Sequence, residues 1–188
     1  MNKQISILLD AEDNLLCVIG ERLLKEFSGK YKILGAAKKH RNSGSGIRKD
    51  ALKWNNAAAN GNIRLALMDL DALAPPQSKN KCPESEIRKA LSNQKKHKNF
   101  LLRVAVFESE SWLLADRNGF SSFFKVPAIN IPKNIDGLRN AKEESRKIIR
   151  GSGIDKRLLE FAKSRWQPKR AAMNSKSLRR TLDRLAKF

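Results

Sequence analysis

The stretch that decides the fold is IRLALMDLD, residues 63–71. A short and almost uninterrupted apolar run of this kind is typical of a strand that is buried on both faces of a parallel sheet. Asp69 and Asp71 follow it two residues apart, and the side-chain period of a strand directs both carboxylates to the same side. The stretch therefore predicts a buried strand whose carboxyl end carries two acids.

Similar apolar runs recur along the chain, and helical patterns lie between them. The predicted strands are residues 5–9, 31–35, 63–68 and 100–107, and the predicted helices are 15–27, 47–60, 83–93 and a short one around 112–114. Apolar strands that alternate with helices indicate a parallel sheet with helices on its faces. We therefore expect an α/β core over residues 1–126, with a mostly parallel four-stranded sheet flanked by helices.

The last third of the chain has a different pattern. After Pro127 and Pro132 no further strand is predicted, and helices are expected at 137–150, 154–166 and 175–186. Between Lys133 and Phe188 there are 17 basic and 6 acidic side chains, a net charge of +11, so this segment carries more than half of the net charge of +20. We expect residues 127–188 to form a basic helical extension packed on the core.

The charge balance points to an anionic partner. The chain has 39 Lys and Arg against 19 Asp and Glu, and such an excess repels itself unless an anion is present. Nucleic acid is the first candidate, an anionic membrane surface is a weaker second, and a solvated helical surface would need no partner. The apolar runs are far shorter than the roughly 20 residues that span a bilayer, so no membrane partner is expected.

The cysteines and the first residues bear on the compartment. Cys17 and Cys82 belong to no CxxC motif and to no cluster with histidine, so a zinc site is not expected. The start of the chain lacks the apolar region of a secretory signal. A reduced, cytoplasmic setting fits best.

Acidic residues follow three of the four predicted strands. They are Asp10, Glu12 and Asp13 after the first, Asp69 and Asp71 after the third, and Glu108 and Glu110 after the fourth. Ligands of an open parallel sheet bind beyond the carboxyl ends of its strands. Carboxylates that lie close together repel one another unless a cation is present, and oxygen-only ligands suit Mg²⁺ or Mn²⁺. The sequence thus predicts a metal site at this edge.

Structural explanations exist for several of these acids. Asp10 would serve equally well as the N-cap of the helix that follows, and Asp13 fits the first turn of that helix better than it fits a metal. Asp71 alone would suit a turn, and Glu110 would suit a solvent-facing position. Three acid-tipped strands in one small domain are more informative than any one acid.

At these residues the sequence resembles the Toprim fold, whose pattern is a Glu just after the first strand and an Asp-x-Asp at the end of a later one. Glu12 and the pair Asp69 and Asp71 match that pattern. The likeness is greatest to small stand-alone Toprim-like proteins that are often encoded beside an ABC-type ATPase. The stretches that carry it are 11–13, 55–58, 67–71, 102–116, 166–168 and 175–178, of which 103–116 is the most specific.

The resemblance implies a function and a site. It implies a divalent metal at Glu12, Asp69 and Asp71, with Glu108 and Glu110 completing the site, and phosphodiester chemistry in antiphage defence with the ATPase as partner. Glu12 would act either as a ligand or as a general base. The only tyrosine is Tyr31, on a predicted strand, so the tyrosine-dependent chemistry of a topoisomerase is not expected.

Basic residues near a Gly/Ser-rich loop, residues 36–46, are the candidate contacts to nucleic acid. They are Lys38, Lys39, Arg41, Arg48 and Lys49. Contacts of lysine and arginine with phosphates give affinity without reading the base sequence. Arg103 lies inside an apolar strand, where an ion pair with a carboxylate is favoured over a phosphate contact. The three tryptophans lie in helical patterns and are expected in the core.

Three hypotheses therefore remain open. The first is a Mg²⁺-dependent nuclease that acts on RNA or DNA with an ATPase partner. The second is a non-catalytic subunit that binds nucleic acid, and the third is an interaction module whose basic helices bind an acidic partner. The first alone requires that Glu12, Asp69 and Asp71 converge.

Overall fold

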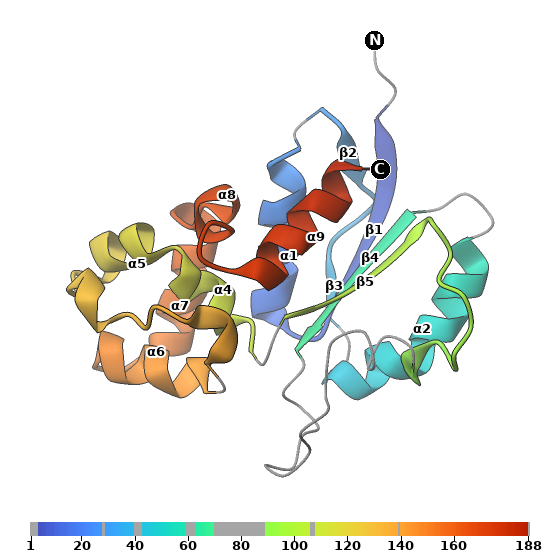
Figure 1. Ribbon diagram of the computed structural model, residues 1–188. Helices are drawn as coiled ribbons and strands as arrows, with labels where there is room; N and C mark the ends of the chain where they lie inside the picture. The colour runs from blue at the N-terminus through green and yellow to red at the C-terminus, as the bar shows by residue number, and fades with distance from the viewer. Residues whose placement is uncertain are drawn as a thin grey trace. The chain divides into compact units, whose positions relative to one another are not determined.

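The computed structural model describes residues 4–27, 29–39, 43–58, 63–69, 89–105, 108–138 and 140–187 (Figure 1). The chain divides into two compact units, Met1–Val104 and Ala105–Phe188. In the described residues the strands belong to the first unit, apart from Ala105 at the end of the last strand, and the second unit is built of helices.

A mostly parallel sheet forms the centre of the first unit. Its strands are β1 (Ile5–Ala11), β2 (Tyr31–Ile33), β3 (Lys38–Lys39), β4 (Ile63–Asp69) and β5 (Phe100–Ala105), and the order is β2-β1-β4-β5. β1 is parallel to both neighbours, with Ile7 opposite Ile33 on one side and Ile63 on the other. The Arg64 N–H donates to Asn99 O at 3.0 Å, so β4 and β5 begin side by side. The predicted α/β class with a mostly parallel sheet flanked by helices is confirmed.

The strand β3 was not predicted, and it corrects the expected loop at 36–46. Lys38 lies opposite Asp10 and Lys39 opposite Ala11. Because β2 pairs only with the first half of β1, the second half would otherwise lack backbone partners on that side, and β3 supplies them. At the other end of the expected loop, residues 43–46 already belong to α2 (Ser43–Ala57).

Two helices cover opposite faces of the sheet. On β4, Leu67 faces α1 (Asn14–Lys25), whereas Ala66 and Met68 face α2. Apolar residues from α2, β4, β5 and the turn before β5 form a buried cluster of Ile47, Ala51, Trp54, Ala58, Ala66, Met68, Ala90, Leu91, Phe100 and Leu102. The alternation of side chains along β4 therefore gives a strand that is buried on both faces, as its apolar sequence predicted.

The start and the packing of α1 follow from its sequence. The Oδ1 atom of Asp13 accepts the Leu16 N–H at 2.7 Å and caps the helix. Gly20 lies on the buried face, where a Cβ atom would be 2.7 Å from Leu9 Cδ1 and 3.0 Å from Leu67 Cδ1. The glycine thus allows the helix to approach the sheet more closely than any other residue would.

The second unit is organised around the short helix α4 (Glu110–Ala115), in which every side chain is buried. Its other helices are α5 (Arg117–Phe124), α6 (Ala141–Ile149), α7 (Ile154–Ser164), α8 (Pro168–Ala171) and α9 (Lys176–Ala186), with 3₁₀ turns η3 (Ala128–Asn130) and η4 (Ile135–Gly137). Phe120 and Phe161 pack edge to face with ring centroids 5.6 Å apart. Trp112 and Trp166 are fully buried, as predicted for the tryptophans.

The elements of the second unit agree only partly with the sequence patterns. The helices expected at 137–150, 154–166 and 175–186 correspond to α6, α7 and α9, whereas α5 and α8 were not predicted. Because α4 contacts α5, α6 and α8, the boundary expected at 126 falls inside this unit. Most of the helix expected at 83–93 lies outside the described residues, which show helix at 89–90 and a turn at 91–93.

Candidate functional site

Glu12 lies at the junction of the two central strands. It follows β1 directly, and its backbone N–H donates to Leu67 O of β4 at 3.0 Å. Its side chain belongs to a residue that is only 8 % exposed, and Oε2 accepts the Asp69 N–H at 2.8 Å. The ladder between β1 and β4 therefore holds the Glu12 carboxylate against the carboxyl end of β4.

The structure brings together two of the three acids in the predicted metal site. Asp69 is the last residue of β4 and is half-buried, and it contacts Glu12 through its backbone. Asp71 lies outside the described residues. Within the described ranges, no group of three or more Asp, Glu, His or Cys side chains is placed to hold a metal ion.

Glu12 has few partners for a buried acid. In the part of the chain that the structure describes, the Asp69 N–H is the one hydrogen-bond donor to its carboxylate, and no lysine or arginine forms an ion pair with it. A buried carboxylate is disfavoured as an anion unless donors or a cation compensate for lost hydration. Glu12 is therefore a side chain whose charge a bound cation would stabilise.

Asp10 and Asp13 have structural roles instead. Asp10 is buried and forms an ion pair with Arg64 of β4, whose guanidinium carbon lies 4.7 Å from the centre of the Trp54 ring. The suggestion that Asp10 caps the next helix is wrong, because Asp13 provides that cap. Asp13 was expected in the first turn of the helix, and the structure places it just before that turn, as the N-cap.

The acidic edge also changes the chemistry of a nearby cysteine. Burial raises the pKa of the Cys17 thiol from 9.0 to about 11, and the charges of Asp13, Glu21 and Asp10 act in the same direction. A thiol with this pKa is almost entirely protonated at neutral pH and is a poor nucleophile. Cys17 is thus a packing residue of α1 rather than a reactive group.

Glu108 and Glu110 belong to the second unit, beyond the last residue of β5. Glu110 is the first residue of α4 and is buried, not solvent-facing. Glu108 Oε2 accepts the Lys142 N–H at 2.6 Å, at the beginning of α6. An anion in that position is stabilised by unpaired N–H groups and by the helix dipole, so the contact gives Glu108 a structural role.

Two of the predicted nucleic-acid contacts lie beside the acids. Lys38 and Lys39 are exposed on β3, in register with the end of β1. Lys49 is exposed on α2. Arg41 lies outside the described residues, and Arg48 is described only through its backbone in α2. The edge that carries Glu12 and Asp69 therefore also carries exposed positive charge.

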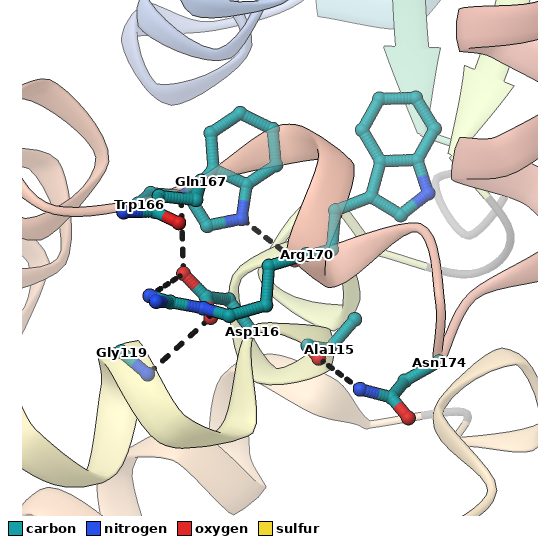
Figure 2. A network of polar contacts seen from close by, with 8 residues as sticks. Ala115, Asp116, Gly119, Trp166, Gln167, Arg170 and Asn174 are labelled. Carbon is teal, nitrogen blue, oxygen red and sulfur yellow. Dashed lines mark hydrogen bonds and ion pairs between the residues drawn. The ribbon is translucent and has the colours of Figure 1, made fainter.

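A buried polar network in the second unit was not found from the sequence (Figure 2). Asp116 is fully buried and forms a two-pronged ion pair with Arg170, whose Nη2 lies 2.8 Å from Oδ2. The same carboxylate accepts the Gln167 N–H at 2.9 Å and the Gly119 N–H at 3.3 Å. The hydrogen bond to Asp116 raises the pKa of Arg170, so the guanidinium stays charged.

Neighbouring contacts extend this network. The Trp166 indole N–H donates to Trp112 O at 3.0 Å, and the Asn174 amide donates to Ala115 O at 2.9 Å (Figure 2). Stretches 112–116 and 166–168, which carry much of the family resemblance, meet here. Because Asp116, Trp112 and Trp166 are fully buried, these residues hold the second unit together and do not face a substrate.

Comparisons with protein-family models, with curated proteins and with solved structures found no match for this chain. Among the described helices, none has the length and apolar character that crossing a membrane requires.

Proposed function

We propose that the chain is a metal-dependent nuclease that cleaves phosphodiester bonds of RNA or DNA. The observation that carries the proposal is the contact between Glu12 and the end of β4. It joins a buried carboxylate without a cationic partner in the described residues to Asp69, at the edge where parallel sheets bind ligands. The resemblance to Toprim proteins, whose acids match Glu12, Asp69 and Asp71, supports the same function.

The donor atoms of this edge fit a hard divalent cation. Glu12 and Asp69 offer carboxylate oxygens, and Mg²⁺ is bound through one or two protein carboxylates with water and substrate phosphate as further ligands. Mg²⁺ or Mn²⁺ would thus be held by Glu12 and Asp69, with Asp71 as a further ligand by the resemblance. When bound, the metal would polarise the scissile phosphate and stabilise the leaving oxygen.

The lysines of β3 would bind the substrate. Lys38 and Lys39 are exposed and lie in register with Asp10 and Ala11, one position before Glu12. Their charge attracts phosphates, which the carboxylates alone would repel. Arg41, Arg48 and Lys49 would continue this contact along the backbone. Binding of this type is sensitive to salt and independent of base sequence.

The wider role rests on the resemblance alone. We propose that the nuclease acts in the cytoplasm as an effector of an ABC-type ATPase in phage defence. A partner of this kind would also restrain an enzyme that damages nucleic acid of its own host. Co-purification of the chain with an ABC-type ATPase from its own cells, and a change in cleavage on adding ATP, would test this.

The nuclease is tested with matched substitutions at one edge of the sheet. Labelled tRNA, single-stranded RNA and plasmid DNA are incubated with the protein in Mg²⁺, Mn²⁺ or EDTA. We expect metal-dependent cleavage that Glu12→Gln and Asp69→Asn each reduce by about 10³-fold or more, as removal of a metal ligand or general base does. Asp13→Asn is the control, since it removes a charge nearby and asparagine still caps a helix.

A non-catalytic nucleic-acid-binding subunit is the second candidate. The observation that favours it is that the described residues bring only two acids, Glu12 and Asp69, together. It predicts salt-sensitive binding without cleavage under every metal condition, also after the ATPase partner is added. That result would contradict the nuclease.

A further inference from the structure

Asn55 of α2 uses both ends of its amide to hold one loop. The residue is 5 % exposed. Its Nδ2 donates to Lys95 O at 3.1 Å, and its Oδ1 accepts the His97 N–H at 2.7 Å. A buried amide with both ends satisfied is costly to disrupt, so Asn55 fixes the backbone between residues 95 and 97.

Further hydrogen bonds fix the end of the same loop. The Asn99 side chain donates to Ala58 O at 3.2 Å, and the Asn99 N–H donates to Nδ1 of His97 at 3.2 Å. The Asn99 carbonyl accepts the Arg64 N–H of β4 at 3.0 Å. The loop is therefore attached to both α2 and the sheet, and its conformation is set before any ligand arrives.

This rigid loop carries a dense positive charge. Lys95, Lys96 and Lys98 lie within four residues, and the side chains of Lys95 and Lys98 are exposed. A turn that only connected two elements would need the backbone hydrogen bonds but not the lysines. An anion would stabilise the exposed charges of Lys95 and Lys98, which lie close together, and a preformed loop loses little conformational entropy when the anion binds.

We propose that residues 95–98 form a binding site for the sugar–phosphate backbone of nucleic acid, with Asn55 as its positioning residue. The proposal rests on the nucleic-acid part of the proposed function and not on cleavage. The loop precedes β5, beside the start of β4, whereas Glu12 contacts the end of β4. At about 3.3 Å per residue, the seven residues of β4 separate the two sites by roughly 20 Å.

The test measures binding of the full chain in EDTA, where metal-dependent cleavage is absent. Fluorescence anisotropy is measured with a labelled DNA duplex and with a labelled single-stranded RNA, and it shows which of the two nucleic acids the site prefers. We expect Lys95→Ala/Lys98→Ala to weaken binding of the preferred probe about tenfold or more at low salt. The slope of log affinity against log salt should fall by about 2, because each lysine removed leaves about one phosphate with its counterion.

The control removes the same charge at the other side of the sheet. Lys25 at the end of α1 and Lys32 on the edge strand β2 are exposed. We expect Lys25→Ala/Lys32→Ala to leave the salt slope within about 0.5 of the wild type, since long-range attraction alone adds no ion release. Equal losses in the two double variants would overturn the proposal.

Asn55→Ala tests the positioning role. We expect this variant to bind several-fold more weakly with an unchanged salt slope, because the lysines remain but the loop must be ordered on binding. A role in stability alone would lower the melting temperature and leave affinity unchanged well below that temperature. Unchanged affinity in a folded Asn55→Ala protein would remove Asn55 from the proposal.

Other outcomes distinguish nucleic acid from a membrane surface as the ligand, and the binding site from the nuclease activity. Vesicles with anionic lipid that bind through Lys95 and Lys98, when neither nucleic acid binds, would overturn the proposal in favour of a membrane surface. Lysine-dependent binding without cleavage in Mg²⁺ or Mn²⁺ would contradict the nuclease and support the binding site. If Glu12→Gln abolishes cleavage while Lys95→Ala/Lys98→Ala changes neither cleavage nor binding, the nuclease is supported and the binding site at residues 95–98 is contradicted.

Discussion

Asp116 and Asp136 of the second unit have more hydrogen-bond partners than Glu12 of the first unit. In the second unit Asp116 is met by Arg170 and by two backbone N–H groups, and Asp136 accepts hydrogen bonds from Ser175 Oγ at 2.7 Å and from Lys176 N at 2.5 Å. In the first unit Glu12 accepts one N–H and, within the described residues, forms no ion pair. Asp116 and Asp136 are thus satisfied within the protein, as Asp10 of the first unit is by Arg64, whereas Glu12 has room for a further ligand.

The place of an acid in the fold explains this difference. The first turn of a helix offers unpaired N–H groups and the positive end of the helix dipole. Glu108 contacts the first turn of α6 and Asp136 contacts the first turn of α9, so neither acid needs a metal. The end of a central strand offers no helix dipole and fewer unpaired N–H groups, and in the described residues Glu12 accepts only the Asp69 N–H. Asp13 supports the rule, because it lies beside Glu12 but caps α1.

The largest effect on stability is expected from breaking the Asp116–Arg170 pair. Arg170→Met keeps the apolar part of the side chain but leaves Asp116 charged and fully buried. Breaking a buried ion pair costs about 3–5 kcal/mol, and the 35 % exposure of the Arg170 side chain reduces this to about 2–3 kcal/mol. Urea unfolding measures the change. Arg165→Met, at an exposed position, should change stability by less than about 0.5 kcal/mol.

A smaller effect is expected in the first unit, where close packing rather than a polar network holds the structure together. Gly20→Val would place a side chain 2.7 Å from Leu9 Cδ1, and overpacking of a core costs about 1–3 kcal/mol. Gly20→Ala should cost less, because alanine is smaller and favours helix by about 1 kcal/mol over glycine. A valine variant as stable as the wild type would contradict the close approach of α1 to the sheet.

The helix-capping role of Asp136 predicts a still smaller loss. Asp136→Ala removes the acceptor of the Lys176 and Ser177 N–H groups, and loss of a cap typically costs about 1 kcal/mol. Asp136→Asn should recover most of this, since an amide oxygen also caps. If both variants were equally destabilised, charge rather than capping would explain the contact. Thermal unfolding of the two variants side by side distinguishes these explanations.

The sequence predicted local structure better than pairing between distant segments. Apolar runs predicted β1, β2, β4 and β5, because strands that are buried on both faces need apolar side chains throughout. β3 has only two residues, both lysine, and no apolar pattern announces it. The helix α8 has only four residues. Such elements exist because the surrounding structure offers them backbone partners, which a local pattern does not record.

The same limit applies to the candidate site. The proximity of Glu12 to Asp69 was predictable in part, because both were expected at the carboxyl ends of strands in one parallel sheet, although no strand order was predicted. The pairs Asp10–Arg64 and Asp116–Arg170 join residues 54 positions apart, and nothing in the local sequence links them. Asp116 did have a local signal as the N-cap of α5, but its buried partner could be found only from the fold.

Glu12→Gln gives the smallest expected change in stability and the sharpest test of the comparison. In EDTA the glutamine oxygen still accepts the Asp69 N–H, and an uncharged amide is less costly to bury than a carboxylate, so stability should stay within about 1 kcal/mol of the wild type or rise. Mg²⁺ at about 100 times its Kd should stabilise the wild type by about 2.7 kcal/mol and leave Glu12→Gln unchanged. Thermal unfolding in EDTA and in Mg²⁺ measures both effects. A large loss of stability in EDTA would show that the fold itself requires the Glu12 carboxylate, as it requires that of Asp116. Glu12 would then be a structural acid and not a metal ligand.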